Sequence, residues 1–133
     1  VNGLRFNRHG RGHYLRSAQE GIAFAFKYGI DIMQDMGLEA QVIRAGKTNM
    51  FLNKVFRETL AGITGARIEL YNTNGGLGAA LGAGVGVRIY QDFETAFKHL
   101  NCIQSVEPDH QSALYMDAYE RWKTLLDDAK AIS

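Results

Sequence analysis

The 133-residue sequence lacks several features that mark whole classes of protein. Its only cysteine, Cys102, cannot form an internal disulfide, so nothing points to an oxidising compartment. No apolar run reaches the roughly 20 residues that a membrane span requires, and the most apolar one, residues 77–87, ends at Arg88. The chain also does not open with a charged and then apolar signal peptide. We therefore expect a soluble, cytoplasmic protein without a membrane partner.

An excess of charge of one sign is also lacking. The 15 lysines and arginines are balanced by 14 acidic residues, which leaves a net charge of +1. Nucleic acids usually bind to a basic surface patch, so the composition predicts no nucleic-acid partner. The length allows a single domain. The chain has one proline against 15 glycines. It begins at Val1 rather than at methionine, which fits processing of the terminus and also fits a piece of a longer polypeptide.

The spacing of apolar residues predicts the order of helices and strands. A long helix from His13 to Gly37 is apolar on more than one side, so we expect it to be buried between layers. Short strands are predicted over residues 40–45 and 66–71, and a helix with Asn49 as its cap lies between them. Three further helices are predicted over residues 77–86, 92–100 and 109–131.

This alternation predicts an α/β fold with parallel strands joined by helical crossovers. Parallel sheets are stable when helices cover both faces, and two strands are few for so many helices. The predicted helices could cover a larger sheet than this sequence supplies. The mismatch indicates that the chain is part of a domain.

A possible phosphate site lies between the first strand and the helix that follows it. The segment Gly46-Lys47-Thr48 matches the end of a P-loop, in which backbone N–H groups bind phosphate. The full motif needs an earlier glycine at the position of Gln41. Three interpretations stay open: a P-loop phosphotransferase, an ordinary turn, and a turn that binds nucleotide in another way.

A second glycine-rich segment, residues 76–82, follows the second strand. Its spacing is GxGxxxG, whereas the dinucleotide fingerprint is GxGxxG, and no strand ending in an acid follows about 20 residues later. We favour close helix packing, in which glycine and alanine let two backbones approach. That interpretation leaves room for a role in shaping a nucleotide cleft.

Catalytic and metal-binding patterns are missing from the sequence. The four histidines have no metal-ligand spacing, and no Ser/His/Asp or Cys/His arrangement stands out. Tyr115, Tyr119 and Trp122 form a helical stripe typical of packing rather than of base stacking. The residues alone therefore predict half of a phosphate or nucleotide site and no catalytic residue. Five carboxylates are expected on solvated helix faces: Asp31, Asp35, Glu58, Asp127 and Asp128.

Three segments share their order and spacing with one known family. The first has the pair Gly3-Leu4, eight intervening residues, and His13 before a helix that begins with small residues. The second is the strand, turn and helix of residues 42–65, and the third spans residues 77–93. In this order the chain resembles the C-terminal domain of FGGY-family carbohydrate kinases, and xylulose kinases most. The family's glycine-rich turn is replaced here by Ala45-Gly46-Lys47.

The resemblance implies part of a ribonuclease-H-like, actin-type ATPase domain. It implies ATP, with Mg²⁺ carried by the nucleotide, as cofactor, and transfer of the γ-phosphate to a sugar hydroxyl, with D-xylulose as the expected sugar. In this family an N-terminal domain binds the sugar and holds the general-base aspartate. Residues 1–133 would then be the ATP-side portion, without that domain and inactive alone. A stand-alone nucleotide-binding or assembly module remains the alternative.

The resemblance also implies site residues. The main chain of Ala45 and Gly46 is expected near phosphate or ribose, and Asn49 or Asn53 near the adenosine, with Asn53 preferred. Gly78 and Ala79 are expected to pack against the residues that contact the nucleotide. A face that the rest of the kinase would cover predicts homo-oligomers of the isolated chain, and its expected contributors are Ile22, Phe24, Phe26, Gly78 and Gly82.

Overall fold

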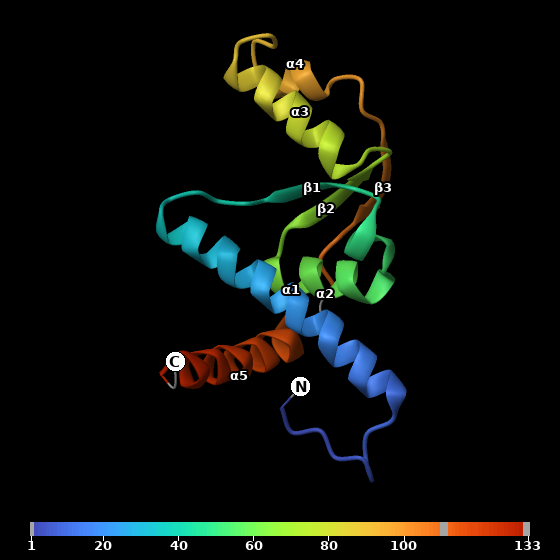
Figure 1. Ribbon diagram of the computed structural model, residues 1–133, viewed down its shortest axis with the longest axis vertical. Coiled ribbons are helices and arrows are strands. Elements are labelled where there is room, and N and C mark those ends of the chain that lie inside the picture. Colours follow the sequence, from blue (N-terminus) through green and yellow to red (C-terminus); the bar gives the residue numbers. More distant parts are fainter. Residues whose placement is uncertain (1, 110–111, 132–133) are drawn as a thin grey trace.

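The computed structural model describes residues 2–109 and 112–131. Its helices and strands confirm the predicted α/β class, and Figure 1 shows their arrangement. In chain order they are α1 (Arg11–Asp35), β1 (Val42–Gly46), the short 3₁₀ helix η1 (Asn49–Leu52), α2 (Lys54–Thr64), β2 (Arg67–Tyr71), α3 (Gly75–Gly86), α4 (Phe93–Phe97), β3 (Cys102–Val106) and α5 (Ser112–Ala131).

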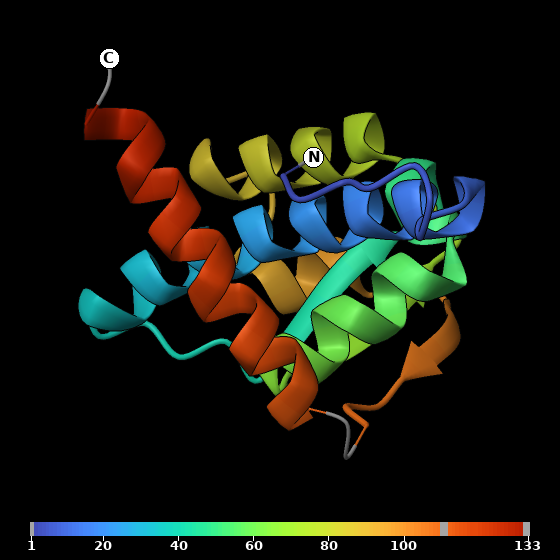
Figure 2. The ribbon, with the colours of Figure 1, turned by 90° about the horizontal axis from the view of Figure 1, so that it is seen from below.

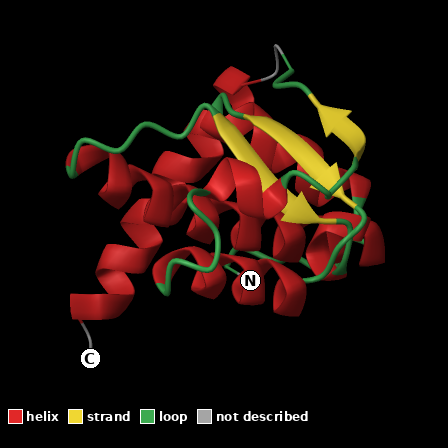
Figure 3. Ribbon diagram, turned by 90° about the horizontal axis from the view of Figure 1, so that it is seen from above, coloured by secondary structure: helices red, strands yellow, loops and turns green. Residues whose placement is uncertain are grey.

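The sheet has three strands in the order β1-β2-β3, which Figure 3 shows side by side. β1 and β2 are parallel and α2 connects them, as the sequence predicts. β3 runs antiparallel to β2 and was not predicted. Val106 pairs with Ile68 and packs against the core, whereas Ile103 falls where the pairing shifts register, so no regular alternation marks the segment as a strand. Pairing with β2 at the sheet edge is what makes this segment extended.

The core lies on one face of the sheet. Ile68 and Leu70 of β2 are fully buried there against Phe56 and Leu60 of α2 and Ala23 of α1. Burying an aliphatic or aromatic side chain of this size contributes about 1.5–3 kcal/mol. Figure 1 shows α1, α2 and α5 on this side of the sheet and α3 with α4 on the other. The predicted period-two burial of β2 is confirmed.

The long helix α1 is less buried than predicted. Ile22 and Phe26 keep 40% and 48% of their surface exposed, so the helix does not lie between two complete layers. Phe24, expected on the exposed face, is buried, and that prediction is wrong. The reason is α5, which crosses α1 and α2 (Figure 2) and places Tyr119 and Trp122 against the Phe24 ring.

A hydrogen bond between Tyr119 and Asp31 joins α5 to α1 inside this cluster. The hydroxyl of Tyr119, which is 1% exposed, donates a hydrogen bond of 2.5 Å to Oδ2 of Asp31. Lys27 forms an ion pair with the same carboxylate. Burial and then the bond to Asp31 raise the pKa of Tyr119 far above its usual value, so the phenol stays protonated. Asp31, expected on a solvated face, is only partly solvated: its side chain is 30% exposed and its carboxylate accepts from this buried hydroxyl.

Replacing Tyr119 by phenylalanine should lower the free energy of unfolding by about 1–2 kcal/mol, because the Asp31 carboxylate loses a buried donor. Urea unfolding followed by circular dichroism measures this. Tyr14→Phe, at a half-exposed tyrosine of α1, is the control and should change stability by less than about 0.5 kcal/mol. Equal effects of the two substitutions would contradict the assigned bond.

Candidate functional site

A cleft of about 820 Å³ lies where β1 and β2 end. The carboxyl ends of parallel strands are the edge at which α/β folds commonly bind ligands. Four of the six residues predicted for the site line this cleft: Ala45 and Gly46 from β1, and Gly78 and Ala79 from α3. The structure therefore brings together two glycine-rich segments that the sequence could only treat separately.

Gly46 is held against the turn that follows β2. A Cβ atom at this position would lie 2.4 Å from the carbonyl oxygen of Thr73, so no side chain fits. The backbone N–H groups of Lys47 and Thr73 both donate to the carbonyl of Tyr71, at 3.0 and 2.8 Å. The two turns are thus joined directly, and substitution of Gly46 would disturb the fold together with any ligand.

The first turn of α3 forms another wall of the cleft. Asn74 caps this helix, and its Oδ1 accepts a hydrogen bond of 3.0 Å from the N–H of Leu77. Gly75 and Gly78 line the cleft, and a Cβ at either position would meet no protein atom within 4 Å. Glycine costs a helix about 1 kcal/mol relative to alanine, and no packing requires it here. These glycines leave open space beside a helix N-terminus, which favours anions.

Close packing, the favoured interpretation of the glycine-rich segment, therefore fails at Gly78. It holds further along the same helix, at Gly84, where a Cβ would lie 2.8 Å from the Tyr90 ring. Spacing alone could not separate these two roles, because both glycines occur in one apolar run of small residues.

The two asparagines predicted near the adenosine do not line the cleft. Asn53 is the cap of α2, and its Oδ1 accepts from the N–H groups of Val55 and Phe56 at 2.9 and 3.4 Å. The cap predicted at Asn49 is wrong, because the 3₁₀ turn η1 intervenes and Asn49 is its first residue, with a φ of 50°. Contact of either asparagine with adenosine stays a prediction.

The geometry after β1 does not support a P-loop. In that motif the lysine and threonine begin an α-helix whose N-terminus holds phosphate. Here Lys47 and Thr48 lead into η1, and α2 begins only at Lys54. The segment resembling a P-loop is therefore a connection of another kind.

Charged groups border the cleft near the strand ends. Arg44 Nε donates to Glu69 at 3.0 Å, and the hydroxyl of Tyr71 donates to the same carboxylate at 2.9 Å. These two bonds, with that from Arg44 the larger effect, hold the pKa of Glu69 below its usual value, so it is ionised at neutral pH. The Glu69 carboxylate pairs with both Arg44 and Arg67, and Lys98, which follows α4, adds another cation to the lining.

Helix α4 is the wall that sequence reasoning missed. Three residues from this region line the cleft, although a loop separates them from α3: Phe93, Phe97 and Lys98. Asp92 caps α4 by accepting from the N–H of Thr95 at 2.7 Å. That cap predicts the helix, but no local signal predicts that the helix returns to the strand ends.

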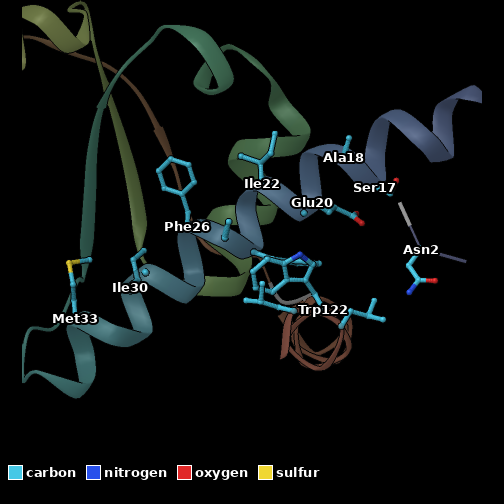
Figure 4. Close-up of a pocket in the computed structure, with 15 residues that line it drawn as sticks. Asn2, Ser17, Ala18, Glu20, Ile22, Phe26, Ile30, Met33 and Trp122 are labelled. Atoms are coloured by element: carbon cyan, nitrogen blue, oxygen red, sulfur yellow. The ribbon is translucent and has the colours of Figure 1, made fainter. Parts of the chain in front are cut away.

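A larger groove, of about 1090 Å³, runs along α1 and α5. Figure 4 shows Ile22, Phe26 and Met33 along α1, with Trp122 of α5 beside the helix. Glu20 is the one ionisable side chain among the lining residues. A long apolar groove of this kind is typical of a surface covered by protein, whereas the cleft at the strand ends offers polar groups to a ligand.

The described part of the chain has neither a metal-binding cluster nor a membrane-spanning helix. Residues 2–109 and 112–131 contain no group of three or more His, Cys, Asp or Glu side chains placed to hold a metal ion. Within the same residues, no helix combines the length and apolar character that crossing a membrane would demand.

Comparison with known proteins found relatives among the sugar kinases. No protein-family model matches the chain. The L-xylulose/3-keto-L-gulonate kinase of Escherichia coli (strain K12) is 31% identical over 126 residues, which cover 89% of this chain and 24% of that protein. The chain thus spans about a quarter of the length of this curated relative.

Solved structures of sugar kinases also match nearly the whole of this chain with about a quarter of their own length. A xylulose kinase from Rhodospirillum rubrum matches 98% of this chain and 27% of its own, with a TM-score of 0.78 and 21% identity. A xylulose kinase from Brucella ovis matches 99% and 28%, with a TM-score of 0.80 and 20% identity. Plasmodium falciparum glycerol kinase, solved with ADP, matches 95% and 26%, with a TM-score of 0.68 and 25% identity. The chain therefore has the actin-like ATPase fold of these sugar kinases, and its resemblance to the C-terminal domain of an FGGY-type carbohydrate kinase is confirmed.

Proposed function

We propose that the chain is the ATP-side portion of a sugar kinase that transfers the γ-phosphate of ATP to a sugar hydroxyl. The observation that carries the proposal is the convergence of Ala45, Gly46, Gly78 and Ala79 on one cleft at the ends of parallel strands. The similarity to a curated sugar kinase and to a glycerol kinase solved with ADP supports it. D-Xylulose is the sugar that we propose, from the overall resemblance to xylulose kinases.

Phosphoryl transfer depends mostly on positioning and on neutralising phosphate charge. At the start of α3 the N–H groups of Leu77 and Gly78 are bonded to Asn74, so those of Gly75 and Gly76 would face phosphate. Gly75 and Gly78 would let the nucleotide approach the backbone. Lys98 would add a positive charge. Mg²⁺ would enter with the nucleotide, bound by its phosphates, and would neutralise charge on the transferred group.

The general base is proposed to lie outside this chain. Glu94 is the acidic residue among those that line the cleft, and its side chain is exposed to solvent on the short helix α4. In the proposed kinase, the base and the sugar would both lie in an N-terminal domain outside residues 1–133. Closure of two domains would then align the sugar hydroxyl and exclude water.

Gly78→Ala should lower the affinity for ATP about fivefold or more, because a methyl group would occupy space that we assign to the nucleotide. The same substitution should raise the free energy of unfolding by about 0.5–1 kcal/mol, because alanine favours the helix. Isothermal titration calorimetry and thermal unfolding measure the two effects on the 133-residue chain.

Gly82→Ala is the matched control on the same helix. A Cβ there would make an ordinary contact of 4.0 Å with the Phe93 ring, and Gly82 does not line the cleft. This variant should gain stability and bind ATP like the unsubstituted chain. If Gly78→Ala also bound ATP unchanged, the nucleotide would not occupy the space beside α3.

The isolated chain should not phosphorylate D-xylulose, because it supplies one wall of the active site and no aligned base. A coupled assay with ATP and D-xylulose measures this, with a host extract lacking the chain as the contamination control. Sugar-dependent ATP consumption that co-purifies with the chain would show that residues 1–133 form a complete enzyme. ATP binding without activity is expected of the kinase portion and also of a stand-alone nucleotide-binding module, so the length of the native polypeptide distinguishes those two.

We further propose that the groove along α1 and α5 is covered in the parent kinase by the rest of the polypeptide. The chain corresponds to about a quarter of its relatives, and this groove is the large apolar surface left beside its longest helix. In the isolated chain the same surface would bring two copies together, which is the homo-oligomer expected from the sequence. Ile22 and Phe26 are the predicted contributors that the structure leaves exposed.

Sedimentation of the isolated chain should therefore show concentration-dependent association, and the double substitution Ile22→Ser and Met33→Ser should weaken it at least about tenfold by removing apolar area from the interface. Leu114→Ser, at an exposed α5 side chain outside the groove, should leave association unchanged. A compact monomer at high concentration, without binding of a dye for apolar surfaces, would contradict the proposal.

A further inference from the structure

The first 16 residues carry an excess of positive charge that the rest of the chain lacks. Residues 1–16 contain four arginines, two histidines and no acidic residue, whereas residues 17–133 contain 11 lysines and arginines and 14 acidic residues. The near-neutral charge of the whole sequence therefore conceals a basic segment. A surface with one sign of charge raises the local concentration of ions of the other sign, so this segment is a candidate for binding an anion.

Five of these residues gather in the turn before α1 and in its first residues, and we term them the basic cluster: Arg5, Arg8, His9, Arg11 and His13. The N–H groups of Arg8 and His9 donate to the carbonyl of Arg5 at 3.0 and 2.8 Å, which closes the turn. The rings of His9 and His13 lie with their centroids 5.7 Å apart. Arg8 precedes His9 in the chain, and Arg11 stands between the two histidines. An anion at the two rings is therefore within reach of these long, flexible side chains.

Backbone hydrogen bonds fix the two imidazoles in the same tautomer. Nδ1 of His9 accepts from the N–H of Arg5 at 2.9 Å, and Nδ1 of His13 accepts from the N–H of Gly10 at 3.3 Å. A ring nitrogen that accepts a hydrogen bond carries no proton, so the neutral ring has its proton on Nε2. Within the part of the chain that the structure describes, neither Nε2–H has a hydrogen-bond partner. Each ring thus keeps one donor for an acceptor from outside the chain.

The three arginines of the cluster have no acidic partner within residues 2–109 and 112–131. Arg16, which follows the cluster, shows the contrast, because it pairs with Glu20 at 2.7 Å. The side chains of Arg5, Arg8 and Arg11 are exposed to solvent. A guanidinium group offers a planar fork of donors that matches the oxygens of a phosphate. Such forks beside two N–H donors suit an anion with several oxygens and more than one negative charge.

The basic cluster is remote from the candidate cleft. Figure 1 shows the N-terminal segment and the start of α1 at one end of the longest axis, and α3 with α4 at the other. No residue of the cluster lines the cleft. An anion bound at the cluster is therefore a second ligand, separate from the nucleotide.

We propose that the basic cluster binds a phosphate dianion, free or as the ester of a small metabolite, with Nε2–H of His9 and of His13 donating to its oxygens and Arg8 and Arg11 neutralising its charge. Charge pairs in contact with solvent are weak, so the expected Kd is about 1 mM. The proposal does not depend on the kinase function, because it uses no residue of the cleft.

The test is a titration of the 133-residue chain, followed by ¹H–¹⁵N NMR at constant ionic strength and about pH 8, where phosphate is a dianion. Inorganic phosphate and glucose 6-phosphate should shift the backbone N–H signals of residues 5–13 with a Kd of about 1 mM, and glucose should not. Tighter binding of glucose 6-phosphate would identify an ester as the ligand, and equal binding would identify phosphate alone. Long-range ¹H–¹⁵N spectra should show the proton on Nε2 of both histidines and a shift of these two nitrogens when phosphate is added.

Two double substitutions test the named groups. Arg8→Ala with Arg11→Ala should weaken phosphate binding about tenfold, because two cations are lost. His9→Asn with His13→Asn should weaken it at least about fivefold, since asparagine can accept the backbone hydrogen bond in place of Nδ1 but has no donor in place of Nε2–H. This variant carries the test if loss of the arginines disturbs the turn.

Lys54→Ala with Arg121→Ala is the matched control, because it removes the same charge from side chains that are 78% and 71% exposed on other helices. It should change the Kd for phosphate less than about twofold. Equal weakening by this control and by the arginine pair would overturn the proposal, because general charge attraction would explain both.

Two further outcomes would contradict the basic cluster as a phosphate site. One is a proton on Nδ1 of either histidine, and the other is a phosphate titration that leaves the signals of residues 5–13 in place. Failure of the chain to bind ATP would overturn the nucleotide cleft and leave the basic cluster standing, so the two proposals fail separately.

Discussion

The close approach of Gly46 to the carbonyl of Thr73 is the contact on which the candidate cleft depends. Parallel pairing of β1 with β2 brings two strand ends to one edge, and the turns that follow can meet only because residue 46 has no side chain. The amides of Lys47 and Thr73 then share the Tyr71 carbonyl, which places the start of α3 beside the end of β1. A side chain at position 46 would push these two walls apart.

The hydrophobic core and the candidate cleft lie in different parts of the structure. One face is closed by α1, α2 and α5 around Phe56, Leu60 and Ile68, none of which has exposed surface. The cleft lies on the other side, between strand ends and the α3–α4 pair, where glycine and alanine replace larger side chains. Glycine at helical positions costs stability, and a cleft wall separated from the core can carry that cost without loosening the packed layers.

The groove beside the exposed side of α1 and the cleft at the strand ends differ in the chemistry of their lining. The groove along α1 and α5 is the larger, yet its lining is a continuous stripe of apolar helix residues of the kind that protein surfaces bury against one another. The smaller cleft combines backbone amides, charged side chains and the aromatic rings of Tyr71, Phe93 and Phe97. Volume alone would therefore favour the groove as the ligand site, whereas the chemistry of the lining favours the cleft.

Local patterns in the sequence determined much of the fold. The α1 periodicity, the alternation in β2 around Ile68 and Leu70, and the stop at Gly65 with a φ of 68° are properties of neighbouring residues, so they could be predicted. Ala45, Gly46, Gly78 and Ala79 were named in advance through the resemblance to FGGY kinases, and they line one cleft. Only the tertiary structure decided which helix face was covered, that residues 102–106 pair as β3, and that Phe97 returns to the strand ends. Those features depend on contacts between residues far apart in the chain, and no local pattern encodes such contacts.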